Sequence, residues 1–158
     1  MIKIFKRFSL TILFFSLLSC AYEPIFSEKN YNFKTGKVIL EGDKDINRII
    51  KNRFDLIKNN VGKDEKIYDI LINSKKNKII AAKDSKGDPS KFELVIETRY
   101  QVNRNQEILL NSKIIKNNIY NNVSDKFKLE QNEKIIIDNL SEKVSEEIIA
   151  SIINLNDN

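Results

Sequence analysis

Cys20 is the residue whose type and position most directly imply chemistry in this chain. Basic side chains precede an apolar stretch at residues 8–18, and Ser19 leads straight into Cys20. A basic segment, an apolar segment and a small residue before a cleavage point form a secretory signal, and a cysteine at the first mature position is typical of bacterial lipoproteins. We therefore expect residues 1–19 to be removed and the Cys20 thiol to be acylated.

A transmembrane anchor and a buried structural thiol are the two alternative readings of this segment. The apolar stretch has 11 residues, whereas crossing ~30 Å of hydrocarbon takes roughly 20. Cys20 is the only cysteine, which excludes a disulfide within the mature domain. Several acyl chains, at about 0.8 kcal/mol per buried CH₂, would hold the domain at a membrane. By similarity to bacterial lipoproteins, in which Asp after the cysteine favours inner-membrane retention, Ala21 indicates the periplasmic face of the outer membrane.

The composition argues against an enzyme. The chain has no histidine, and its single cysteine is assigned to the anchor, so the usual general base, the commonest metal ligand and a thiol nucleophile are all missing. A periplasmic hydrolase with two carboxylates is the remaining catalytic option. Glu93 and Glu97 share one face of a predicted strand, but residues four apart on a strand are separated by roughly 13 Å. We expect no catalytic residues, no metal and no cofactor.

The net charge does not indicate a nucleic-acid partner. The chain has 27 basic and 22 acidic residues, and three of the basic ones lie in the signal, so the mature domain is nearly balanced. Mixed charge of this kind normally solvates a surface.

The first half of the mature chain alternates strand, helix and strand. Residues 37–41 form a short apolar strand between Gly36 and Gly42. Apolar residues then recur at steps of three and four from residue 44 to residue 60, which predicts a helix capped by Asp43 or Asp45. After a charged turn at 63–66, residues 68–73 alternate as a half-buried strand, which resumes at 78–83 after a polar break.

The second half predicts a hairpin and a long helix. A turn-rich segment, residues 84–89, precedes the clearest alternation in the chain, from Phe92 to Val102. A four-residue loop at 103–106 reverses the chain into a strand at 108–116. Ser124 or Asp125 caps a helix that runs to about Asn154, whose wide apolar sector suggests a second contact with the first helix or with a partner.

These elements predict an α+β fold, a two-layer sandwich in which a mostly antiparallel four-stranded sheet carries two helices on one face. We divide the chain into a signal peptide at 1–19, a lipidated tether at 20–35 and one domain at 36–158. The helix-free face mixes apolar and charged residues, so it either meets water or lines a protein wall.

The start of the mature chain resembles the LPS-assembly lipoprotein LptE family. In that family the lipidated cysteine is followed by Gly, an aromatic, any residue, Pro, an aliphatic and an aromatic. Here Ala21 replaces the Gly, while Tyr22, Pro24, Ile25 and Phe26 keep the expected types. The order of strands and helices is also similar, so the resemblance covers nearly the whole mature chain.

This resemblance implies a non-enzymatic plug inside the β-barrel translocon that delivers lipopolysaccharide to the cell surface. The chain would assist assembly of that barrel and contact the passing lipopolysaccharide. No motif transfers a lipopolysaccharide site, and solvated surface charge is the competing reading of every basic candidate. The candidates are Lys83, Lys86, Arg99, Arg104, Lys113 and Lys116.

A different outer-membrane lipoprotein is the alternative function. An accessory of the barrel-insertion machinery, or an auxiliary subunit of a lipid transporter, would share the signal, the size and the sandwich fold. These cases differ in the partner rather than in the chain.

Overall fold

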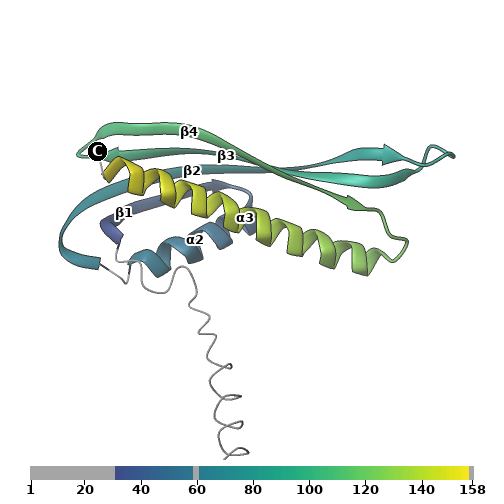
Figure 1. Ribbon diagram of the computed structural model, residues 1–158, viewed down its shortest axis with the longest axis horizontal. Helices are drawn as coiled ribbons and strands as arrows, with labels where there is room; N and C mark the ends of the chain where they lie inside the picture. Colours follow the sequence, from purple (N-terminus) through teal and green to yellow (C-terminus); the bar gives the residue numbers. More distant parts are fainter. Residues whose placement is uncertain (1–30, 59–60, 157–158) are drawn as a thin grey trace, which may run out of the picture.

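A computed structural model describes residues 31–58 and 61–156 of the chain. Both helices cover the same face of one four-stranded sheet (Figure 1), in the strand order β1-β2-β3-β4. β1 and β2 are parallel, and the other two pairs are antiparallel. The predicted α+β sandwich with a mostly antiparallel sheet is therefore confirmed. The elements in chain order are β1 (Tyr31–Gly42), α2 (Lys44–Lys58), β2 (Val61–Lys83), β3 (Pro89–Arg104), β4 (Glu107–Asn121) and α3 (Lys126–Asn156).

The parallel pair arises because α2 crosses between β1 and β2, which returns the chain to the end of the sheet from which β1 started. Asp43 begins this helix, since its Oδ1 accepts the amides of Asp45 at 3.0 Å and Ile46 at 3.2 Å. A carboxylate at this position satisfies amides that have no partner within the helix. Of the two predicted caps, Asp43 is the one used.

β2 is one continuous strand, and the predicted turn at 63–66 and the polar break after residue 73 are both wrong. The polar residues in this stretch that point toward the helices have partners on α2 or at its start. Ser74 Oγ donates to Asn47 Oδ1 at 2.8 Å, and the Lys76 ammonium lies 3.2 Å from the Asp43 carboxylate. Because these groups are paired, the strand continues through a sequence that looks like a loop.

The β3–β4 hairpin has a two-residue turn rather than the predicted four-residue loop. Arg104 and Glu107 still pair across the strands, which leaves only Asn105 and Gln106 in the turn. Both have positive φ, 51° and 68°. Positive φ at both central residues is the geometry of a type I′ turn, whose twist matches that of the strands. At the other end of β3, Pro89 begins the strand, a position where its missing amide is tolerated.

The core lies between the sheet and the helices. Alternate residues of β3, from Leu94 to Val102, are buried, and Ile96 is fully inaccessible, so the predicted faces of this strand are correct. α3 packs on both the sheet and α2. Ion pairs link the helices, Arg48 to Asp138 at 3.3 Å and Arg53 to Glu146 at 3.1 Å. In the wide apolar sector of α3, Ile137 and Ile149 are buried, whereas Ile135 is 57% exposed.

β1 begins at Tyr31, earlier than the predicted start of the folded domain at residue 36. Phe33 is fully buried and packs edge-on against the ring of Tyr68, with 6.0 Å between the ring centres. An aromatic side chain of this size contributes about 2 kcal/mol or more when it is removed from water. The strand therefore includes residues that were expected to belong to the tether.

Candidate functional site

The predicted lipidation site, Cys20, lies outside the described residues. The ten residues between it and Tyr31 carry the motif that suggested the family resemblance.

The six basic candidates do not converge on one site. Lys83 and Lys86 lie at the tip of the β2–β3 hairpin, which projects past the first turn of α3 (Figure 1). Arg104 lies at the opposite end of β3, beside the turn into β4. The other three lie along the middle of the sheet, where Arg99 and Lys113 occupy the helix-free face and Lys116 points toward α3.

Asp84 organises the hairpin tip that carries two of these lysines. Its Oδ1 accepts the amides of Lys86 and Asp88, both at 2.9 Å, and its own amide donates to the carbonyl of Asp88 at 2.8 Å. Gly87 adopts φ +88° in this turn, a conformation that costs glycine little. The tip is thus an ordered turn that presents mixed charge.

Charge on the helix-free face is compensated locally. Glu97 of β3 lies 2.8 Å from the Lys113 ammonium and 3.2 Å from the Arg99 guanidinium. The hydrogen bond from Lys113 is the main reason that the pKa of Glu97 lies below its ordinary value, and the charge of Arg99 adds to it. Glu93, on the same face, accepts a hydrogen bond from the side-chain amide of Asn117. Both carboxylates of the hydrolase hypothesis therefore take part in cross-strand pairing.

Isoleucine side chains surround these charges on the helix-free face. Ile115 and Ile119 of β4 and Ile67 of β2 are each more than half exposed. Exposed isoleucines among paired charges form a surface that another protein can cover without stranding an unpaired charge. The exposed isoleucines of this face are Ile39, Ile67, Ile79, Ile115 and Ile119.

The end of the sheet at the β2–β3 hairpin carries a second group of aromatic and apolar side chains. Phe92 of β3 lies against Tyr120 of β4, with 6.0 Å between ring centres, and the Lys78 ammonium stands 4.2 Å above the Phe92 ring. Such a cation–π interaction contributes about 0.5–1 kcal/mol at an exposed site. Ile80, opposite Phe92 in the register, is half exposed.

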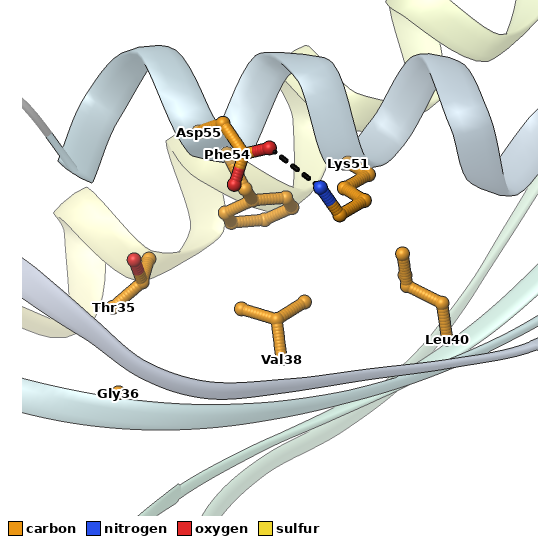
Figure 2. Close-up of a pocket in the computed structure, with 7 residues that line it drawn as sticks. All are labelled: Thr35, Gly36, Val38, Leu40, Lys51, Phe54 and Asp55. Carbon is orange, nitrogen blue, oxygen red and sulfur yellow. Dashed lines mark hydrogen bonds and ion pairs between the residues drawn. The ribbon is translucent and has the colours of Figure 1, made fainter.

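A cavity of about 180 Å³ lies between β1 and α2 (Figure 2). Val38 and Leu40 of β1 lie on one side of it and the ring of Phe54 of α2 on the other, and Lys51 pairs with Asp55 at 2.9 Å on the same helix. Ligand sites for small molecules usually measure 300–1,000 Å³, and the ion pair here uses up the charged groups of the lining. The cavity is large enough for one apolar side chain, and its lining offers no nucleophile with an adjacent base.

Two buried hydroxyls have no hydrogen-bond partner within the described ranges, Tyr68 Oη and Thr98 Oγ1. In the same ranges no cluster of three metal-binding side chains occurs. None of the described helices is long and apolar enough to span a membrane.

The sequence predicted the mixed helix-free face but not the cavity between β1 and α2. The alternation in β3 predicted a face of mixed apolar and charged residues, but the pairing of these charges across the strands depends on the register of β4. The cavity between β1 and α2 had no local signal, because its lining comes from two elements that meet only in the folded chain.

Neither a protein-family description nor a curated protein sequence matches this chain. Solved structures do share its fold. Rare lipoprotein B from Shewanella oneidensis superposes with a TM-score of 0.60 at 13% identity, covering 75% of this chain and 95% of that one. An uncharacterized lipoprotein B from Nitrosomonas europaea gives 0.57 at 14% identity, covering 80% and 88%. A minor lipoprotein from Acinetobacter baumannii gives 0.51 at 15% identity, covering 75% and 92%. The chain therefore has a fold that occurs in bacterial lipoproteins.

Proposed function

We propose that this chain is the lipid-anchored, non-enzymatic subunit of an outer-membrane β-barrel that exports lipopolysaccharide. Acylated Cys20 would hold it at the periplasmic face of the outer membrane, where the α+β domain would plug the barrel and assist its assembly. The observation that carries this proposal is the combination of a lipoprotein-type cysteine with a sandwich fold that is also found in solved bacterial lipoproteins.

The helix-free face supports a role inside a polar protein enclosure. The interior of a large membrane barrel is polar, and an enclosed charge is costly unless it is paired. Glu97 brings its own partners, Lys113 and Arg99, to any such interface. The exposed isoleucines between the charges add apolar contact area, so this face suits a wall that is partly polar and partly apolar.

The proposal includes direct contact with the lipopolysaccharide that passes through the barrel. Its phosphates and acidic sugars attract lysine and arginine, and the exposed residues Lys83 and Lys86 lie at the projecting hairpin tip. The other basic candidates lie in separate places, so we assign no lipopolysaccharide-binding residue.

Depletion of the chain in its native host tests the proposal against its alternatives. We expect loss of the mature lipopolysaccharide-exporting barrel and of newly exported surface lipopolysaccharide, with porins unchanged. A general barrel-insertion accessory would lower the porins as well, and an auxiliary subunit of a lipid transporter would leave both kinds of barrel intact. Either of those patterns would overturn the proposal. Wild-type chain should restore export, whereas Cys20→Ser should not.

A further inference from the structure

The two edges of the sheet are built differently. β1 is irregular, with register shifts between Tyr31 and Phe33 and between Thr35 and Val38. Bulges of this kind discourage a further strand from pairing. β4 keeps an unbroken register with β3 from Leu110 to Asn121, and it contains no proline. Among the described residues, β4 is therefore a long, regular edge without the usual structural protection.

The free backbone groups of β4 can be assigned from its ladder. The amide of Asn122 donates to the carbonyl of Ser90 at 2.9 Å, so this residue points its backbone groups toward β3. The backbone amides and carbonyls of successive residues point to alternate sides of an antiparallel strand. Odd-numbered residues from Asn111 to Asn121 therefore present their amides and carbonyls away from the sheet, where only another extended strand can pair with all of them.

Lysines often protect an edge, but the two on this part of β4 are engaged within the molecule. Lys113 pairs with Glu97 of β3 at 2.8 Å, and Lys116 pairs with Glu147 of α3. Ile115 and Ile119, on the same strand, are 55% and 57% exposed. The lysine charges of this edge are thus partly compensated within the molecule, and the edge is partly apolar.

We propose that a second copy of this chain pairs with it, β4 against β4, in antiparallel orientation about a two-fold axis at Asn117. β4 suits this edge because it carries isoleucines on one face, and because its two lysines are engaged by carboxylates of their own copy. The pairing would join two four-stranded sheets into one continuous sheet, with the helices of both copies on the same side.

Charge and apolar contact select this axis. An axis at Lys113 or Lys116 would place two ammonium groups directly opposite each other, which is unfavourable in a sheet. An axis at Asn117 places Ile115 opposite the partner's Ile119 on the helix-free face. On the helix face Ile114 and Tyr120 are already buried within each copy, so the apolar gain comes from the isoleucine pair. This contact occurs twice because of the symmetry.

A hollow beside β4 leaves room for the added strand. Its volume is about 460 Å³, and it lies between Asn118 of β4 and a mostly polar flank of α3. That flank consists of Ile136, Asn139, Leu140, Glu142, Lys143 and Glu146. Side chains on the helix face of a fifth strand would stand over this hollow, which the four strands of one copy leave open. The pairing applies to chain that is not enclosed in a barrel, so its test and the test of the proposed export function can fail separately.

Spin-label distances test the axis in the full processed chain in detergent micelles. A β-strand rises about 3.3 Å per residue. With the axis at Asn117, labels on Asn121→Cys in two copies should lie about 27 Å apart, and labels on Asn111→Cys about 40 Å apart. Wild-type chain, carried through the same labelling, gives the background from Cys20. Absence of dipolar coupling, or the reverse order of the two distances, would overturn the proposal.

A second measurement separates strand pairing from co-occupancy of a micelle by two lipid anchors. Ile119→Lys should weaken self-association by about tenfold or more, as measured by light scattering over a range of protein concentrations. Ile67→Lys is the matched control, because Ile67 is 56% exposed on the same face but lies away from the β4 edge, and it should leave association unchanged. Both variants should keep the wild-type circular dichroism. Equal association by both variants would overturn the proposal.

Discussion

The hydroxyl of Tyr120, at the end of β4, donates a hydrogen bond of 2.7 Å to Glu133 of α3. Lys78 of β2 binds the same carboxylate, so one group of α3 connects two strands. Burial is the main cause of the raised pKa of Tyr120, and the hydrogen bond and negative charge of Glu133 raise it further. The phenol therefore stays protonated as a donor, and it fixes the edge strand to the long helix.

Tyr120→Phe should lower the free energy of unfolding by about 1.5–3 kcal/mol. The reason is that a hydrogen bond to a charged group is lost where the ring is buried. Urea denaturation, followed by circular dichroism at neutral pH, measures the change.

Tyr68→Phe is the matched comparison, and it should leave stability unchanged or raise it by about 1 kcal/mol. The Tyr68 hydroxyl is buried without a partner in the described part of the chain, so its removal ends a desolvation cost. A loss at position 68 as large as that at position 120 would show that both hydroxyls are bonded.

Asp43→Ala should destabilise the domain by about 1 kcal/mol at pH 7, the usual cost of losing a helix cap. Burial acts to raise the pKa of Asp43, but the Ile46 amide and the Lys76 ammonium outweigh it and lower the pKa below its ordinary value. Because the pKa of Asp43 is lower in the folded chain than in the unfolded chain, its carboxylate stabilises the folded chain at pH values above the unfolded pKa. This stabilisation is lost as the pH falls through the folded pKa.

The stability difference between wild type and Asp43→Ala should therefore shrink as the pH falls below about 4. Denaturation curves at several pH values measure it. Asp55→Ala, which removes an exposed ion pair with Lys51, should cost at most about 0.5 kcal/mol. A difference for Asp43 that stays constant down to pH 3 would contradict the assigned role of its charge.

Local sequence patterns predicted the strands and helices that are determined by interactions between residues close in the sequence. The alternation from Phe92 to Val102 identified a strand and its buried face, and Asp43 identified the start of α2. Ser74 and Lys76 look like loop residues because their partners, Asn47 and Asp43, come from an earlier part of the chain. Their place in β2 depends on tertiary contacts, which no local pattern contains.

Ile96→Asp should destabilise the domain by several kcal/mol, because it places an unpaired charge in the core. Ile115→Asp on the helix-free face should have little effect, since this side chain is 55% exposed. Thermal unfolding of both variants compares the two faces. Similar melting temperatures for both would contradict the assignment of the faces.

The candidate site was predictable only in part. The lipoprotein cysteine is a local motif, so sequence alone predicts an anchor at Cys20. Lys83 ends β2 beside the start of β3, and Arg104 ends β3, so their separation follows from strand direction and could have been anticipated from the hairpin. The pairing of Lys116 with Glu147 depends on how α3 crosses the sheet, which the order of elements does not specify.

Cys20→Ser should leave the chain unprocessed or released from the membrane fraction. Lipid on the thiol is expected to supply the anchor, and several acyl chains bind a bilayer far more tightly than one. Cell fractionation, with intact mass measurement of wild-type chain, checks this. Recovery of fully processed Cys20→Ser protein in the membrane fraction would contradict the prediction.

The most direct test of the proposed function is purification of the tagged, lipidated chain from its native host in mild detergent, followed by mass measurement of the intact complex. We expect one lipopolysaccharide-exporting barrel in stoichiometric amount with this chain. A stoichiometric complex with the barrel-insertion machinery or with a lipid transporter, and no exporting barrel, would contradict the account.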